Sequence, residues 1–328
     1  MFMTERHESK EQLFYEVLEK RCALHDGEAK RLKILRQGLE GERIYDRLWD
    51  EVGHADLMIF RDIWMRIENA VLQIDALVVT DGKLIVNEIK NYSGRYMYED
   101  GTWYVNNFQI SEDPLAQLSR TAGKLVRLKY LDQKQFDAEK KVVFVNPDFN
   151  LTTSSVEGRK HIVDRSLLKH YLRDIARSHS GQNASELASA IHQYMTEDPM
   201  TVPEVETGRI RAGFYCGRCN AFDLELEPFR TRCILCGHLE TVEYQTVRAI
   251  IDFANLFPEQ GITKHNLRWI TGGEVGDRRM ERYLNKYCTL TRRGKHSAYT
   301  IDTLDLGELL KMKSYTSRYE KDKSILAD

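Results

Sequence analysis

The pattern of apolar and polar positions along the chain is clearest between residues 71 and 90, where it predicts a β-hairpin. The pair Asp81-Gly82 interrupts two runs in which apolar residues alternate with others. Such a pair between alternating apolar runs is a strong signal of a two-residue hairpin turn. In that register Thr80 faces Lys83, and this one pair fixes which residues are opposed along both predicted strands.

The predicted register brings acidic side chains together. Counting outward from the turn places Asp75 opposite Glu88 and Gln73 opposite Lys90. Opposed residues point to the same face with Cβ atoms about 4.5–5.5 Å apart, and like charges placed there are destabilising. A divalent cation such as Mg²⁺ would compensate, because carboxylate oxygens are its preferred ligands. Lys90, on the same face as Glu88, is placed to orient a water or to stabilise phosphoryl charge.

Both faces of this hairpin are apolar. The acidic face also carries Leu77, Val79, Leu84 and Val86, and the other carries Leu72, Ile74, Ala76, Val78, Ile85 and Ile89. The alternative is a solvated hairpin with ordinary surface charges, which favours one polar face. We therefore expect other elements to cover the hairpin on both sides.

The rest of the chain up to about residue 195 reads as a mixture of helices and strands. Helical spacing of apolar residues predicts several helices, of which the first two are amphipathic and are expected to pack on the sheet. Turn signals mark the ends of several further strands. The expected helices cover residues 8–25, 28–51, 115–131, 167–175 and 185–195, and the expected strands cover 57–64, 95–99, 102–105 and 141–145.

The residues of the hairpin carry a resemblance to a known family. The dipeptide Ile74-Asp75 and the run from Glu88 to Gly94 (EIKNYSG) resemble the nuclease-related domain (NERD), a branch of the PD-(D/E)XK nuclease superfamily, over about residues 38–145. The segment Gly38–Glu42, Trp103 and the segment Pro114–Gln117 belong to the same resemblance. It implies an α/β fold, a restriction-endonuclease-like mixed sheet flanked by helices, and metal-dependent hydrolysis of DNA.

The resemblance also implies roles for single residues. Asp75 and Glu88 correspond to ligands of Mg²⁺ or Mn²⁺, and Lys90 to the catalytic lysine. Glu42 corresponds to an auxiliary acid from the preceding helix, and Gln117 to a glutamine that follows the core in one subset of these nucleases. These five residues are our candidate catalytic residues.

Three further positions bear on this site. Gly41 lacks a side chain, which would allow its helix to approach the active-site strands closely. Ala76 stands where the family pattern favours His, and Thr121 stands where related enzymes often have Tyr or Lys. These two departures remove no metal ligand, but they leave rate and substrate preference open.

Composition narrows the class of protein. The chain has 328 residues, of which 42% are apolar and 30% charged, as is ordinary for a soluble globular protein of two or three domains. No apolar run approaches the ~20 residues that span a bilayer, and the charged N-terminal stretch does not resemble a signal peptide. We therefore expect a cytoplasmic protein. With a net charge of −2, any basic surface must be local.

Four of the six cysteines are grouped in two CxxC pairs, Cys216/Cys219 and Cys233/Cys236. This spacing predicts a zinc ribbon in which four thiolates hold one structural Zn²⁺. A redox-active CxxC is the alternative. Four thiolates leave no open coordination position, so we expect this zinc to stabilise the fold rather than to catalyse.

The chain after Thr246 changes to helices and a basic hairpin, an order that resembles a winged helix-turn-helix domain. Between Thr263 and His296 there are nine Lys or Arg against three Asp or Glu, an excess of six positive charges. Such a local excess is typical of phosphate binding. A protein-interaction module with a solvated basic face is the alternative. The candidate DNA contacts are Arg278, Arg279, Arg282, Arg292, Arg293 and Lys295.

These patterns predict five segments. They are a nuclease-related domain (1–196), a linker with Pro199 and Pro203 (197–208), the zinc ribbon (209–243), the winged-helix-like domain (244–315) and a tail (316–328). The function that fits is a Mg²⁺-dependent DNA endonuclease targeted by its C-terminal half. The alternatives are a non-catalytic nucleic-acid-binding or regulatory protein that retains the fold as a scaffold, and a nuclease acting on RNA or on a branched structure.

Overall fold

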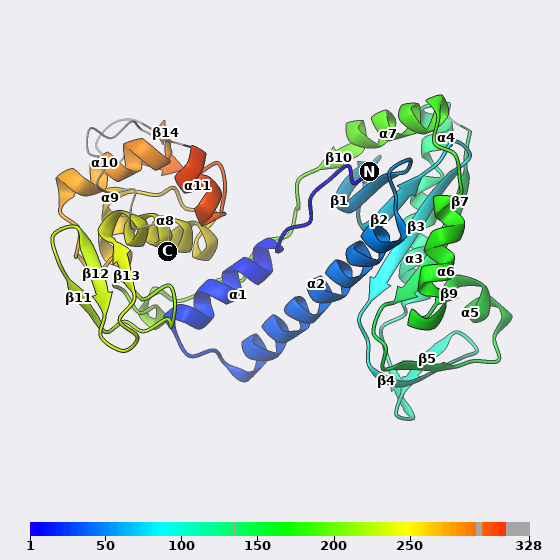
Figure 1. Ribbon diagram of the computed structural model, residues 1–328, viewed down its shortest axis with the longest axis horizontal. Coiled ribbons are helices and arrows are strands. Elements are labelled where there is room, and N and C mark those ends of the chain that lie inside the picture. The colour runs from blue at the N-terminus through cyan, green and yellow to red at the C-terminus, as the bar shows by residue number, and fades with distance from the viewer. Residues whose placement is uncertain (134, 293–296, 313–328) are drawn as a thin grey trace. The chain divides into compact units, whose positions relative to one another are not determined.

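A computed structural model describes residues 1–133, 135–292 and 297–312, and the chain forms two units (Figure 1). Of the described residues, the first unit comprises those within Met1–Glu8 and Lys33–Pro199, and the second comprises Ser9–Leu32 and those from Met200 onward. Within the described ranges, no helix is long and apolar enough to cross a membrane.

The first unit is built on a mixed six-stranded sheet in the order β10-β1-β2-β3-β7-β9. The strands β1, β2 and β3 are antiparallel neighbours, whereas β7 and β9 run parallel to β3. The strand bounds are β1 Met58–Ile67, β2 Ala70–Val79, β3 Lys83–Lys90, β7 Asp137–Phe144, β9 Ile162–Val163 and β10 Met195–Thr196. The predicted mixed α/β fold is therefore confirmed.

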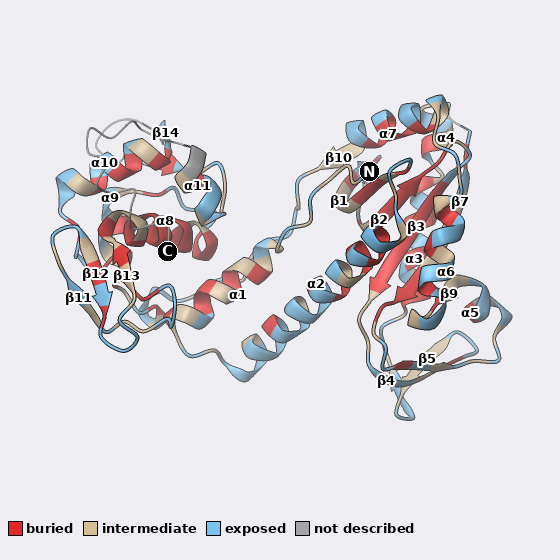
Figure 2. Ribbon diagram, viewed as in Figure 1, coloured by how far each residue is buried: buried red, intermediate tan, exposed pale blue. Residues whose placement is uncertain are grey.

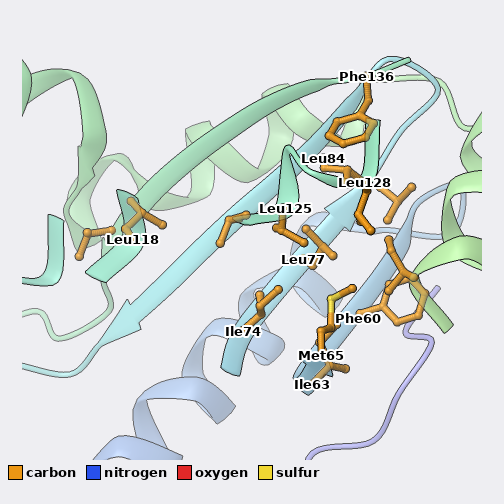
Figure 3. Close-up of a cluster of buried hydrophobic side chains, with 14 of the residues drawn as sticks. Phe60, Ile63, Met65, Ile74, Leu77, Leu84, Leu118, Leu125, Leu128 and Phe136 are labelled. Carbon is orange, nitrogen blue, oxygen red and sulfur yellow. The ribbon is translucent and has the colours of Figure 1, made fainter. Parts of the chain in front are cut away.

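Helices cover both faces of this sheet, as the two apolar faces of the hairpin predict. One face packs against α2 (Asp26–Val52) and α6 (Arg165–Ala176). The other packs against α3 (Pro114–Leu125), α4 (Leu128–Leu131) and α7 (Gln182–Tyr194) (Figure 3). The expected single helix over residues 115–131 is thus divided into two at Val126 and Arg127, which keep helical backbone angles but form a turn between α3 and α4.

The strict alternation expected along β2 does not hold. Ile74 packs in the same cluster as Leu77, and Leu72 lies against that cluster, whereas Ala76 and Val78 face the other way. The change of face coincides with Asp62 of the neighbouring strand β1, which adopts a left-handed backbone conformation with φ of 46° while the β1–β2 register stays in step on both sides of it. Such a residue interrupts the regular pleat of a strand pair.

A second, four-stranded sheet in the order β6-β5-β4-β8 adjoins this core. Its strands are β4 Gly94–Glu99, β5 Thr102–Val105, β6 Phe108–Ile110 and β8 Phe149–Thr152. The turn between β4 and β5 is Asp100-Gly101, with φ of 49° and 79°. Positive φ at both turn residues suits a tight hairpin, so the predicted hairpin at this place is confirmed.

The first helix, α1 (Lys10–Arg21), does not pack on the nuclease-related sheet as predicted. Its buried side chains, which include Phe14 and Leu18, belong to the second unit, where α1 packs against α8 (Val242–Leu256). The Arg21 guanidinium forms an ion pair of 2.7 Å with the Asp252 carboxylate of α8, and both side chains are buried. Residues 9–32 therefore fall outside the first unit, although the expected domain of residues 1–196 includes them.

The second unit continues with a three-stranded sheet and a group of helices. The sheet has the order β11-β12-β13, with bounds Leu224–Leu226, Arg230–Cys233 and Leu239–Thr241. After α8 come α9 (Lys264–Ile270), α10 (Asp277–Tyr287), the hairpin strands β14 (Thr289–Arg292) and β15 (Ala298–Thr300), and α11 (Leu306–Met312). Figure 2 shows that α8 is buried around most of its circumference. The order of three helices and a hairpin matches the expectation, and the winged-helix assignment stays a prediction.

Candidate active site

The register of the β2–β3 hairpin is the one that the Asp-Gly turn predicts. The Thr80 amide donates to the Lys83 carbonyl at 3.0 Å. In the described ladder, pairing runs from Val79–Leu84 to Ala76–Asn87. Asp75 and Glu88 come directly after its last pair, so the two acids lie where the strands begin to separate.

Asp75 joins the two strands through its side chain beyond that point. Its Oδ2 accepts a hydrogen bond of 2.8 Å from the Ile89 amide. Gln73 does not pair with Lys90 as predicted, since the β2–β3 ladder ends at Ala76–Asn87. It pairs with Trp64 of β1, and its side-chain amide donates to Asp62. The carboxylate of Asp75 is thus held in the opening between β2 and β3.

Glu88 and Lys90 form an ion pair at this opening, with 2.8 Å between Oε1 and Nζ. Glu88 is buried, whereas Lys90 retains access to solvent. Burial, with the charge of Asp75, raises the pKa of Glu88 to about 7 against the opposing effect of Lys90. Burial likewise raises the pKa of Asp75, and Lys90 opposes it. Two neighbouring carboxyls whose pKa values are raised chiefly by burial would gain from a cation bound between them.

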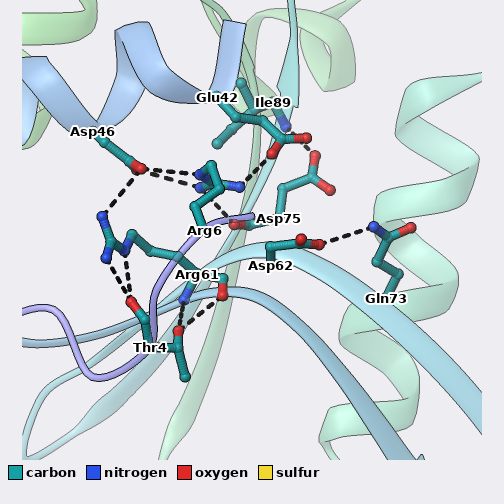
Figure 4. A network of polar contacts seen from close by, with 9 residues as sticks. All are labelled: Thr4, Arg6, Glu42, Asp46, Arg61, Asp62, Gln73, Asp75 and Ile89. Atoms are coloured by element: carbon teal, nitrogen blue, oxygen red, sulfur yellow. Dashed lines mark hydrogen bonds and ion pairs between the residues drawn. The ribbon is translucent and has the colours of Figure 1, made fainter. Parts of the chain in front are cut away.

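Glu42 joins the site from α2, as the resemblance implies. Its carboxylate is bound by the Arg6 guanidinium, which also contacts Asp46 and the backbone of Asp75 (Figure 4). Burial, followed by the charge of Asp75, raises the pKa of Glu42 to about 8 even though Arg6 lowers it. Glu42 and Asp75 therefore share one electrostatic environment.

Gly41 lets α2 approach the end of β3 closely, as predicted. A β-carbon at Gly41 would stand 2.5 Å from the Cβ of Asn91, the residue after Lys90. The same place is fixed by two reciprocal hydrogen bonds of 2.8 Å between Gln37 and Asn91. Because Glu42 follows Gly41, this close approach positions the helix acid beside the strands.

Asp62 is an acid of this site that the sequence reasoning missed. The β1–β2 pairs Arg61–Ala76 and Ile63–Ile74 place it opposite Asp75. Its charge contributes to the raised pKa of both Asp75 and Glu42. A signal was present, since treating residues 68 and 69 as a two-residue turn and counting outward would have opposed Asp62 to Asp75. Arg6 was also missed, and no pattern in its segment points to it.

Gln117 lies on the accessible side of the same site. It lines a pocket of about 380 Å³ together with Lys90, Tyr92, Glu112 and Arg120. The Tyr92 hydroxyl donates to Glu112 at 2.6 Å. The pocket therefore joins the candidate catalytic lysine and the predicted glutamine in one space.

Comparison with known families agrees with this geometry. The family model described as nuclease-related domain matches residues 37–145. This chain contains a nuclease-related domain. The matched region of that domain includes the five candidate catalytic residues and Asp62, whereas Arg6 lies before it. Neither a curated protein nor a solved structure gives a significant match.

The donor set of the nuclease-related domain fits a hard divalent cation. Asp75 and Glu88 offer carboxylate oxygens, which are the ligands of Mg²⁺ and Mn²⁺, and the charges of Glu42 and Asp62 act on Asp75 from nearby. Among the described residues, only the four cysteines form a group of three or more such ligands within 4.8 Å of one another. The buried carboxyls with raised pKa values gain most from such a cation. The residues at the opening between β2 and β3 are therefore a candidate metal centre.

The four predicted zinc ligands come together in the second unit. The sulfurs of Cys216, Cys219, Cys233 and Cys236 all lie within 4.8 Å of one another, and each of these cysteines is a free thiol. Two of the sulfur–sulfur distances are 3.5 Å. Four sulfurs at about 2.3 Å from one Zn²⁺ would be roughly 3.8 Å apart. The cluster is thus compatible with a zinc ribbon.

The basic surface of the second unit is narrower than the charge count suggests. Lys264, Arg268 and Lys286 each form an ion pair, with Glu281, Asp277 and Glu243 respectively. On α10, Arg278 and Arg282 are exposed, whereas Arg279 donates to the Pro228 carbonyl at 2.8 Å. Arg293 and Lys295 lie outside the described residues, as does the side chain of Arg292.

Proposed function

We propose that this protein is a Mg²⁺- or Mn²⁺-dependent endonuclease of the PD-(D/E)XK type that hydrolyses phosphodiester bonds of DNA. The observation that carries the proposal is the junction of β2 and β3 in the nuclease-related domain. There Asp75, Glu88 and Lys90 meet where the strands separate, beside an accessible pocket.

Each side chain has a role that follows from its place. Asp75 and Glu88 would hold the cation, which supplies a Lewis acid and favours deprotonation of a water. Lys90 faces the pocket with a charged ammonium group, so it stabilises negative charge that develops on the phosphate and orients the attacking water. Gln117 lines the same pocket and positions the substrate backbone by hydrogen bonding.

The second unit would bring DNA to this site. Zn²⁺ at the four cysteines would stabilise the ribbon. Exposed Arg278 and Arg282 on one helix offer charge to phosphates, and Arg279 links that helix to the ribbon. In keeping with the charged sequence, we propose a cytoplasmic location.

Incubation with nucleic acid tests this function. The chain is incubated with supercoiled plasmid, linear DNA and RNA, with Mg²⁺, with Mn²⁺ or with EDTA. Nicking or linearisation of the plasmid that requires the cation and is lost in Glu88→Gln is expected. Cleavage of RNA alone would assign a ribonuclease. Binding without cleavage in every condition would assign a non-catalytic protein that retains the nuclease-related domain as a scaffold.

A further inference from the structure

Arg6 is the feature of the candidate metal centre that neither the family match nor the sequence pattern explains. It lies outside the matched region, and its side chain is only 3% exposed. A guanidinium buried to this extent is retained only where several acceptors compensate it.

The segment that carries Arg6 is fixed along β1. The Met3 amide donates to the Ile59 carbonyl at 2.8 Å, and the Arg61 amide donates to the Thr4 hydroxyl at 2.6 Å. Figure 4 shows Arg6 reaching from this segment between α2 and β2. The main chain thus determines where the guanidinium lies.

The guanidinium fork binds three groups of the site. It contacts the Glu42 carboxylate, binds Asp46 through Nε at 2.9 Å, and donates to the Asp75 carbonyl at 3.1 Å. Glu42 and Asp46 are one helical turn apart on α2, where two like charges repel. A cation coordinated by Glu42 would have to compete with Arg6, which is anchored at the other two positions.

The charges around Asp75 leave a negative balance that a mobile cation would neutralise. When ionised, Glu42, Asp62, Asp75 and Glu88 contribute four negative charges, and Arg6 and Lys90 contribute two positive charges. Arg61 compensates Asp46, to which it is bonded at 3.2 Å. Two negative charges remain, which one divalent cation neutralises.

We propose that Arg6 is a positioning residue that acts as a fixed cation in the metal centre, holds Glu42 and limits the site to one divalent cation. The proposal rests on the proposed function only for the presence of a metal centre. Many nucleases use two metal ions, and in this chain Arg6 takes the place of the second. Loss of Arg6 would leave Glu42 free to bind another cation.

Mn²⁺ binding to the full zinc-loaded chain, measured by electron paramagnetic resonance of free Mn²⁺, tests this. The parent is expected to bind one Mn²⁺, and Asp75→Asn should abolish this binding. The Arg6→Gln variant is expected to bind two Mn²⁺. The double variant Arg6→Gln, Glu42→Gln should bind one Mn²⁺ again. Arg6→Lys, which keeps the charge, is expected to stay at one. Arg43→Gln is the matched control. Arg43 lies on α2 beside Glu42, but it pairs with Glu8 at an exposed site. A parent that binds none or two, or an Arg6→Gln variant that binds one, overturns the proposal.

A second variant keeps the test decisive if Arg6→Gln fails to fold. Glu42→Gln alone retains Arg6, so it is expected to keep the single Mn²⁺. Abolished binding would show that Glu42 is a required ligand, and the proposal would be wrong. The stoichiometry is independent of DNA cleavage, so a protein that binds Mn²⁺ in this pattern and cuts nothing would contradict the proposed function alone.

Discussion

Gly41 of α2 and Asn91 at the end of β3 lie so close that a β-carbon on Gly41 would stand 2.5 Å from the Cβ of Asn91. Gly41→Ala is therefore expected to destabilise the first unit by about 1–3 kcal/mol, the usual cost of overpacking. Because Glu42 and Lys90 are the adjacent residues, cleavage should also fall. Gly38→Ala on the same helix has open space around its new methyl group. That control should be neutral or stabilising by up to about 1 kcal/mol. Equal melting temperatures for the two variants would contradict the close approach.

Lys90 and Lys83 lie on the same strand but differ in environment. Replacing each in turn therefore distinguishes the loss of a catalytic group from the loss of a positive charge. Lys90→Ala should lower the cleavage rate by at least about 100-fold, as for other groups that stabilise transition-state charge. Lys83, which pairs with Glu139 at 2.6 Å on an exposed surface, should be replaceable by Ala with little effect. DNA affinity in EDTA should stay near the parent value in both variants. Comparable loss of cleavage in the two would argue against a specific role for Lys90.

Stability of the metal-free first unit should fall as the pH rises. The pKa of Glu88 is raised to about 7 and that of Glu42 to about 8, both from 4.5. Their protonated forms therefore favour the folded state, and this contribution is complete below about pH 4.5 and lost as the pH rises through 7 to 8. Without added cation, the melting temperature relative to that of the Glu42→Gln, Glu88→Gln double variant should decrease from pH 6 to pH 9.

Mg²⁺ should reverse this loss, because it binds the ionised carboxylates. We expect a larger rise in melting temperature on adding Mg²⁺ at pH 8.5 than at pH 6, and little rise in the double variant. A pH-independent difference between parent and variant would count against the shared electrostatics of these acids.

The four-cysteine cluster should bind about one zinc per chain. Cys233→Ser should remove it and unfold the ribbon, while the β2–β3 site keeps its Mg²⁺-dependent activity on short DNA. Cys22→Ser is the matched control, since Cys22 lies outside the cluster. Elemental analysis and circular dichroism report the two effects. Unchanged zinc content in Cys233→Ser would overturn the assignment.

Arg278 and Arg282 should contribute to DNA affinity through phosphates. Replacing both with Ala should reduce the slope of log affinity against log salt by about two units, since each lost phosphate contact removes about 0.9. Arg177→Ala, which removes a charge paired with Asp174 in the first unit, should leave the slope unchanged. If the α10 variant binds like the parent, the second unit is better explained as a protein-interaction module.

The part of the site that the sequence predicted is the part set by local geometry. One Asp-Gly turn fixes the β2–β3 register as far as the Ala76–Asn87 pair, whereas the opposition of Asp75 and Glu88 lies beyond the described ladder and stays a prediction. The predicted close approach at Gly41 needs only the absence of a side chain. Both inferences depend on residues that are near each other in the chain or on backbone sterics.

The parts that the sequence did not predict depend on distant contacts. Arg6 meets Glu42 only because its segment lies along β1. The faces of β2 change where Asp62 of β1 adopts a left-handed conformation, so strict alternation misplaced Ile74. The amphipathic pattern of α1 reveals an apolar face but not the partner that covers it.

The pairing of α1 with α8 also means that α1 is synthesised long before the helix that covers it. Arg21 and Asp252 are 231 residues apart in sequence, so at about 5–20 residues per second a ribosome needs roughly 10–50 s to make the second after the first. All of the matched nuclease-related region, residues 37–145, is made within this interval. The apolar face of α1 is therefore without its native cover throughout the synthesis of that region.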